Sequence, residues 1–140
     1  FIDFQEEKAS SYLAGKLGIS EGEVILKVSR VLSADGRPAI YCEDYFDKKL
    51  IREAYTMKDF ELPIFHFIKK CCYLEAHLDL TQLRAALVDE KLSNHLNLEI
   101  GSPILNMEEV DYDLYGNIVF YSSQYFVGEF FEQTVLRKKL

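Results

Sequence analysis

Arg30 is the side chain of this 140-residue sequence whose chemistry most requires a partner. It lies in a run of apolar residues, and in a strand it would share a face with Val28 and Leu32. A buried guanidinium must either extend to water or meet an anion, because an unpaired buried charge is strongly destabilising. Two interpretations follow: an internal salt bridge, for example to Asp79 or Glu43, or binding of a ligand carboxylate or phosphate.

Two other segments are candidates to complete a ligand site around Arg30. His77 and Asp79 alternate with apolar residues, and they would reach the same cavity if their strand adjoins that of Arg30. Core packing is the default for a run of aromatic residues, and a pocket wall is the alternative. One face of such a run, near the C-terminus, consists of Phe120, Ser122, Gln124 and Phe126.

The residues give little indication of metal binding or of nucleophilic catalysis. The three histidines fall on separate predicted elements, and the adjacent Cys71 and Cys72 would point to opposite faces of a strand, so we predict no metal site. Cys42 lies in mid-strand, where a buried small side chain is the default and an activated thiol the alternative. There is no G-x-S-x-G elbow and no Gly-rich phosphate loop. We therefore predict neither a cofactor nor enzymatic activity.

Composition indicates one globular domain in a reducing compartment. Apolar residues make up 49% and charged residues 28%, with 10 Phe, 9 Tyr and no Trp. The net charge of −7 argues against a nucleic-acid surface, and the one basic cluster is Arg137-Lys138-Lys139. Three cysteines are a poor disulfide framework, and we see neither a membrane span nor a signal peptide. We expect a cytoplasmic protein with a segment missing upstream of Phe1.

Hydrophobic periodicity and turn residues predict the elements that must position these side chains. The predicted strands are Phe1–Gln5, Val24–Leu32, Ala39–Phe46, Cys72–Gln82, Ile104–Asp113, Ile118–Val127 and Phe130–Val135, and the predicted helices are Glu6–Leu17, Leu62–Lys70 and Leu83–Leu96. The Asp35-Gly36 step favours the positive φ of a tight hairpin turn, and Gly116 lies in a second turn. The order predicts an α+β fold, an antiparallel sheet with helices packed against it.

Several short motifs carry a resemblance to a known family. The sequence LGI-x-x-G-E precedes the first hairpin, L-x-x-G-S-P precedes the second, and Arg30 opens R-x-L-x-A-D-G-x-P on the first. In this order the motifs resemble the UTRA domain, the effector-binding half of the HutC branch of GntR-type bacterial transcription regulators. The resemblance covers nearly the whole chain, as a single domain over residues 1–140.

The resemblance implies a chorismate-lyase-like sheet that binds a small-molecule effector. It further implies a homodimer, and DNA binding only through a winged-helix domain upstream of this chain. Arg30 matches the first of two arginines that hold phosphate in members sensing phosphorylated sugars, whereas Leu32 replaces the second. Cys42 stands where such members often have Glu, Phe120 replaces a frequent acidic residue, and Phe126 a ligand-facing Tyr.

The predicted ligand site therefore consists of Arg30, Cys42, His77, Asp79, Phe120, Ser122 and Phe126. The apolar residues that stand at this site in place of polar family residues favour an anionic effector with an apolar body over a sugar phosphate. Two alternatives stay open: an enzyme of the same fold acting on a small aromatic acid, and an oligomerisation module without a pocket.

Overall fold

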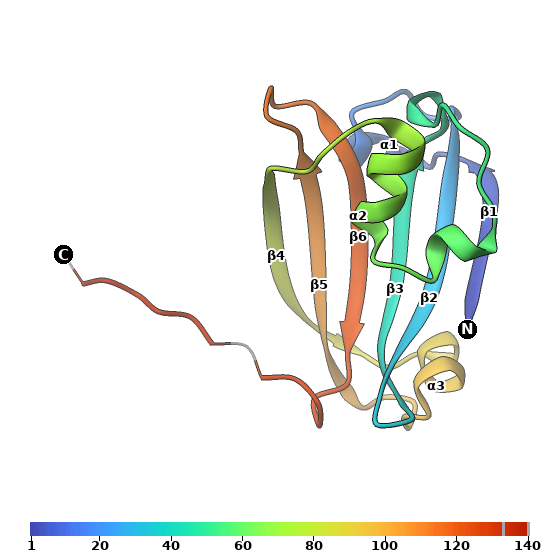
Figure 1. Cartoon of the computed structure of the whole chain (residues 1–140). Coiled ribbons are helices and arrows are strands. Elements are labelled where there is room, and N and C mark those ends of the chain that lie inside the picture. Colours follow the sequence, from blue (N-terminus) through green and yellow to red (C-terminus); the bar gives the residue numbers. More distant parts are fainter. Residues whose placement is uncertain (133, 140) are drawn as a thin grey trace.

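The computed structural model describes residues 1–132 and 134–139 and contains one six-stranded antiparallel sheet (Figure 1). The strand order across the sheet is β1-β2-β3-β6-β5-β4, so β1 and β4 form its two edges. The strands are β1 (Ile2–Lys8), β2 (Val24–Ala34), β3 (Arg37–Asp47), β4 (Leu78–Leu87), β5 (Pro103–Tyr112) and β6 (Ile118–Phe126). Together with the helices packed against it, this sheet confirms the predicted α+β class.

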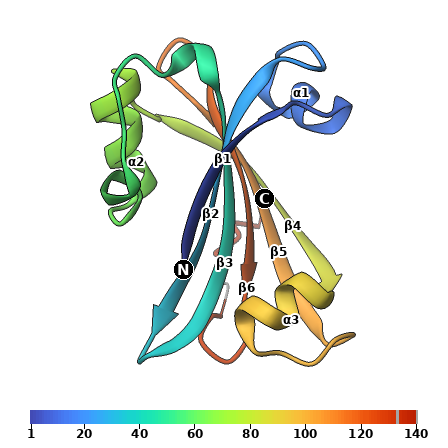
Figure 2. The ribbon, with the colours of Figure 1, turned by 90° about the vertical axis from the view of Figure 1, so that its right-hand side faces the viewer.

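The helical segments cover the two faces of the sheet unequally. They are α1 (Ser11–Leu17), η1 (Lys48–Leu50), η2 (Met57–Phe60), α2 (Ile64–Phe67), the π-helical η3 (Ile68–Cys72) and α3 (Glu90–Leu96). Figure 2 shows α1 and α3 at opposite ends of one face, and α2 over only one end of the other. We call the latter the α2 face; its remaining end carries no helix of the described residues.

Tight turns hold the two hairpins in register. Asp35 and Gly36 have φ values of 52° and 75°, as predicted for the β2–β3 reversal. In the β5–β6 turn the Asp113 carboxylate accepts hydrogen bonds of 2.9 Å from the backbone N–H groups of Tyr115 and Asn117. The two-residue period of the strands then decides which side chains meet on each face.

The hydrophobic core divides between the faces accordingly. Under α2, the β2 side chains Leu26 and Val28 pack with Phe46, Phe67 and Phe120, all buried. Separate clusters lie under α1 and under α3 on the opposite face. Because α2 is short, its cluster fills only one end of its face.

Two predicted elements begin later than expected. Residues 6–8 were predicted to open a helix, but they continue β1, and Glu6 and Glu7 pair with β2. The helix begins after Ser10, whose hydroxyl accepts a hydrogen bond of 3.2 Å from the Leu13 backbone N–H. The predicted strand Cys72–Gln82 is also wrong in its first half, because Cys72 closes the π-helical turn of η3 and β4 starts at Leu78.

The predicted helix Leu83–Leu96 is wrong in its first half as well. Residues 83–87 belong to β4, where they pair with residues 103–107 of β5. The helix starts only after Asp89, whose carboxylate caps it by accepting from the Leu92 backbone N–H at 2.8 Å. The predicted last strand, Phe130–Val135, includes residue 133, which lies outside the described residues, and its described members form no strand. None of the described helices has the length and apolar character needed to cross a membrane.

Candidate ligand-binding site

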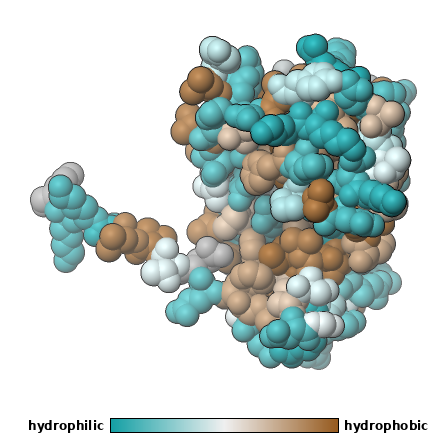
Figure 3. Space-filling view, in the orientation of Figure 1, coloured by the Kyte–Doolittle hydropathy of each residue, from teal (hydrophilic) through white to brown (hydrophobic). Residues whose placement is uncertain are grey.

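A cavity of about 560 Å³ lies on the α2 face, between the sheet and the segment that leads into α2. Its size falls within the range of small-molecule pockets. Figure 3 shows apolar side chains at the surface just below this segment. Of the residues that line the cavity, Leu32 and Leu62 are 40% and 46% exposed. The lining residues are Arg30, Leu32, Cys42, Asp44, Glu61, Leu62, Pro63, Ile64, Phe65, Asp79, Glu109, Phe120 and Gln124.

Strand register arranges the floor of this cavity in rows that cross the sheet. Directly opposite residues of antiparallel strands share a face, so each row runs from one strand to the next across the sheet. The first row is Arg30, Cys42, Gln124 and Met107; the second is Asp44, Ser122, Glu109 and Thr81; the third contains Phe120, Asp111 and Asp79. The polar and acidic groups therefore lie in adjacent rows although they come from five strands.

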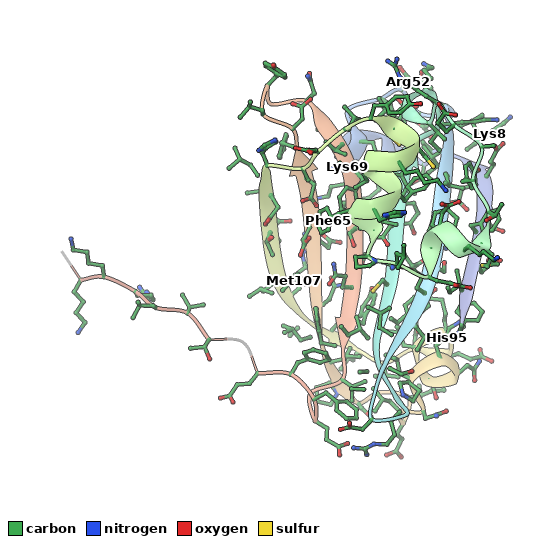
Figure 4. The ribbon with its side chains drawn as sticks, in the orientation of Figure 1. Lys8, Arg52, Phe65, Lys69, His95 and Met107 are labelled. Carbon is green, nitrogen blue, oxygen red and sulfur yellow. The ribbon has the colours of Figure 1, made fainter. Side chains whose placement is uncertain are left out.

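The α2 segment supplies the other wall. Phe65, which Figure 4 labels on α2, contacts Phe120 edge to face, with ring centroids 6.0 Å apart. Phe120 is buried against Phe46 as well, at 5.4 Å between centroids. The aromatic wall is thus continuous with the core under α2, and the cavity begins where that core ends.

Arg30 forms an internal ion pair, although with neither of the two acids considered from the sequence. Its Nη2 lies 3.0 Å from Oδ2 of Asp44 on the neighbouring strand, and both side chains are buried. Burial raises the pKa of Asp44, and the guanidinium opposes that shift. Nη1 donates to the Leu62 carbonyl at 3.4 Å, a long contact, while Nε has no partner. Arg30, a residue that lines the cavity, therefore retains a buried donor without a partner.

The opposite side of the cavity is acidic. Asp79 of β4 and Asp111 of β5 are direct cross-strand partners, and Glu109 lies two residues from Asp111 on the same face. Within the described part of the chain, no Lys, Arg or His forms an ion pair with any of the three. Burial, and then the neighbouring carboxylates, raises the pKa of Asp111 to about 7, and the same causes raise the pKa of Glu109.

Cys42 is buried in the first row and does not provide a nucleophile. Burial raises the pKa of its thiol to about 12, with Asp44 contributing in the same direction. The reactive thiolate is therefore scarce at neutral pH. Among the described residues, no group of three or more His, Cys, Asp or Glu side chains is arranged to hold a metal ion.

The structure brings together most of the residues predicted from the sequence. Arg30, Cys42, Asp79 and Phe120 line the cavity, and Ser122 lies in its floor, fully buried. His77 does not line the cavity: it precedes β4, is exposed, and lies 3.8 Å from Glu75. Phe126 is on the same face but one row beyond Arg30, where it packs against Phe131 at 5.1 Å.

Several residues of the site were not predicted from the sequence. Asp44 and Glu109 share strand parity with Cys42 and Asp111, so alternation alone would have placed them on the cavity face. Leu62 and Phe65 carry no such signal, because only the packing of α2 on the sheet brings them to the cavity.

Comparisons with known proteins identify similar sequences and folds. The UTRA domain family model matches residues 1–132. No curated protein matches the chain significantly. The possible transcriptional regulator YydK from Bacillus subtilis subsp. subtilis str. 168 is 24% identical, with a TM-score of 0.86 over 97% of this chain. This chain spans 59% of YydK.

Two further solved structures share the fold. A GntR-family transcriptional regulator from Enterococcus faecalis V583 is 19% identical, with a TM-score of 0.84 and coverage of 96% of both chains. The effector domain of PhnF from Mycobacterium smegmatis is 19% identical, with a TM-score of 0.84, covering 98% of this chain and 84% of that one.

The Arg30–Asp44 pair predicts a specific stability pattern. Arg30→Met should lower the free energy of unfolding by about 3–5 kcal/mol, because it leaves Asp44 buried without a counter-charge. Arg30→Met combined with Asp44→Leu should recover most of that loss. Arg37→Met, which removes an exposed pair with Glu129, should change stability by less than about 1 kcal/mol. Urea unfolding measures all three; equal stability of Arg30→Met and the parent would contradict the assignment.

The raised pKa of Asp111 predicts how stability depends on pH. Its carboxyl binds a proton more tightly in the folded chain than in the unfolded chain, where its pKa is 3.8. The free energy of unfolding should therefore fall as pH rises from about 4 to about 7, and stay low above that range. Asp111→Asn should reduce this slope and be more stable than the parent at about pH 8, but not at about pH 4. Parallel slopes for parent and variant, from urea titrations across this range, would refute the prediction.

Proposed function

The chain belongs to the UTRA domain family, and from this premise we propose that the cavity on the α2 face binds the small-molecule effector of a bacterial transcription regulator. The observation that carries the proposal is the unused Nε donor of buried Arg30 at a cavity of ligand size. Buried polar atoms normally find a partner, so a group from a ligand is the natural complement.

The effector that fits the Arg30 end combines an anionic group with an apolar body. A carboxylate or phosphate that binds the guanidinium would supply an acceptor for Nε, the donor that Asp44 does not use. Leu32, Leu62 and Phe65 then offer an apolar surface on both sides of the cavity. The cavity thus complements the effector class predicted from the sequence, an anionic molecule with an apolar body.

The regulatory mechanism we propose is a population shift. The cavity lies between a rigid sheet and the short α2 segment, which continues into the π-helical η3. A ligand that touches both walls favours one position of α2 over others, because it can shift an equilibrium only by its differential affinity. We propose that this change alters the placement of winged-helix DNA-binding domains attached upstream of Phe1.

An effector sensor accounts for the site better than either alternative. Cys42, the thiol at the cavity, is held protonated by burial and so provides no activated nucleophile for an enzyme. A module that served only oligomerisation would have no need of a ligand-sized cavity with an unused buried donor. The R-x-L-x-A-D-G-x-P hairpin supports membership of the HutC branch, and three free cysteines support action in the cytoplasm.

We also propose that the domain is a homodimer that pairs through the edge strand β4. Its ten residues are hydrogen-bonded to β5 on one side only. Leu80 on one face and Leu83 on the other are 59% and 48% exposed, and Leu78 and Leu87 are each 69% exposed. A long apolar edge of this kind is a template for pairing with a second chain. Regulators that read two half-sites require such two-fold symmetry.

The effector site is tested first with the full-length protein purified from its host. Native mass spectrometry should reveal a bound small molecule, and isothermal titration then gives its Kd. Arg30→Met with Asp44→Leu should weaken binding by about 1.5–3 kcal/mol, or roughly 10- to 150-fold, because a charge-assisted hydrogen bond is lost. Arg37→Met serves as the control and should bind like the parent. Chemical conversion of the bound molecule would instead support an enzyme.

The dimer is tested by light scattering of the purified chain. The parent should have the mass of two chains at tens of micromolar, and Leu80→Lys with Leu83→Lys should have the mass of one, because lysines on an edge strand oppose pairing. Leu114→Lys, in the β5–β6 turn, introduces the same charge at a 69% exposed leucine and should remain dimeric. A monomeric parent would exclude the dimer, and a dimeric double variant would exclude β4 as its interface.

A further inference from the structure

The cavity has an acidic end on the side of the sheet away from Arg30. Asp79 and Glu109 line this end, and Asp111 lies beside them as the cross-strand partner of Asp79. Asp79 is exposed at the sheet edge, Glu109 is half-buried, and Asp111 is 3% exposed. Glu109 also lies in the same row as Asp44, with Ser122 between them. Negative charge is therefore concentrated on one side of a single cavity.

The chain itself provides almost nothing to balance this charge. Within the described residues, the Thr81 hydroxyl donates to Asp79, and no side chain donates to Glu109 or Asp111. Oδ2 of Asp111 is buried without a hydrogen-bond partner. Like charges directly opposite each other on a sheet are unfavourable, and an unpaired buried carboxylate is more so.

Arg30, at the other end of the cavity, is an independent indication of a ligand site. Arg30 is 7% exposed, lines the cavity, and directs no hydrogen bond from Nε. One end thus offers an unused donor and the other end unused acceptors, with apolar walls between them. A molecule that satisfies both ends must carry opposite kinds of group at its two ends.

The missing positive charge is better supplied by an organic cation than by a metal ion. Among the described residues no three carboxylate, imidazole or thiol groups are placed to coordinate one metal. A hydroxyl group can donate to a carboxylate, but it leaves the excess negative charge uncompensated. An ammonium group has three donors and a full positive charge, and it can reach several carboxylates at once.

We propose that the effector carries an ammonium group that binds at Glu109, between Asp79 and Asp111. This inference rests on the proposed effector site and adds a second subsite to it. With its anionic group at Arg30, the effector is then a zwitterion whose two charged groups lie at opposite ends of an apolar body, as in an ω-amino acid.

Binding at this subsite is linked to protonation. Asp111 faces Asp79 from β4, Glu109 from β5 and Asp44 from β3, and it keeps its proton up to about pH 7 in their company. A positive charge placed beside these groups lowers the pKa of Asp111, because it favours the charged carboxylate. An ammonium ligand should therefore release a proton on binding near neutral pH, whereas a neutral or anionic ligand should not.

Three probes of similar size separate the possible sources of affinity: 2-phenylethylammonium, 2-phenylethanol and 3-phenylpropionate. Their binding to the chain is measured at neutral pH by NMR titration and by calorimetry in two buffers of different ionisation enthalpy. The test variant is Asp79→Asn with Glu109→Gln, which keeps side-chain shape while removing charge. Glu108→Gln is the matched control, since Glu108 is on the same strand but the opposite face.

We expect the ammonium probe to bind with a Kd on the order of 1 mM, at least about 10-fold tighter than 2-phenylethanol, with proton release. The double variant should reduce that preference to within about twofold, and Glu108→Gln should retain it. Equal binding of the ammonium and the alcohol, or undiminished ammonium binding in the double variant, would overturn the subsite.

The anionic probe distinguishes this failure from failure of the effector site. Suppose that 3-phenylpropionate binds the parent but not Arg30→Met with Asp44→Leu, and that the ammonium probe does not bind the parent. This result overturns the ammonium subsite alone. Absence of binding by all three probes at about 10 mM counts against both proposals. Binding of Mg²⁺ or Ca²⁺ that blocks the ammonium probe would replace the organic cation with a metal ion.

Discussion

The register of β3 against β6, at the centre of the sheet, is the constraint on which the site depends. It sets Cys42 opposite Gln124 and Asp44 opposite Ser122, and β2 and β5 extend the same rows to both sides. A slip of one residue would transfer this whole set to the face covered by α1 and α3. The core under α2 resists such a slip, because Phe46 and Phe120 stack on the same register at 5.4 Å. The packing that stabilises the fold thus also aligns the cavity.

The surroundings of buried carboxylates differ between the two faces of the sheet. On the α1 and α3 face, burial acts to raise the pKa of Glu43, but hydrogen bonds from Lys27 and Lys91 outweigh it and lower that pKa. On the α2 face, no basic side chain of the described residues pairs with Glu109 or Asp111, and their pKa values are raised. Since the chain supplies two lysines to a single glutamate on one face, the lack of a cation on the other does not follow from a shortage of basic residues. The ammonium subsite proposed above would account for it.

Strand-level features of the fold and site could be predicted from the sequence, and features that depend on packing could not. Alternation placed Arg30, Cys42 and Phe120 in strands of the correct parity, and Asp35-Gly36 located the first hairpin turn. The apolar spacing of residues 83–96 favoured a helix, but pairing with β5 keeps its first part in β4. A local pattern carries no information on pairing with a distant strand. For the same reason, the partner of Arg30 could not be chosen among several acids before the β2–β3 register was known.

The position of α2 is the feature through which ligand binding at the cavity would act in the proposed regulation. The α2 segment carries Phe65 over the cavity, and its core contacts through Phe67 join the same cluster as β2 and β3. A ligand that neutralises the acidic row removes repulsion from the sheet, and its apolar body adds contacts to α2. The second effect depends on α2 lying close to the sheet, so the contacts of the apolar body favour that arrangement over any in which α2 moves away. The cavity can therefore convert occupancy by one small molecule into a preference for one conformation, which is the physical requirement for an effector domain.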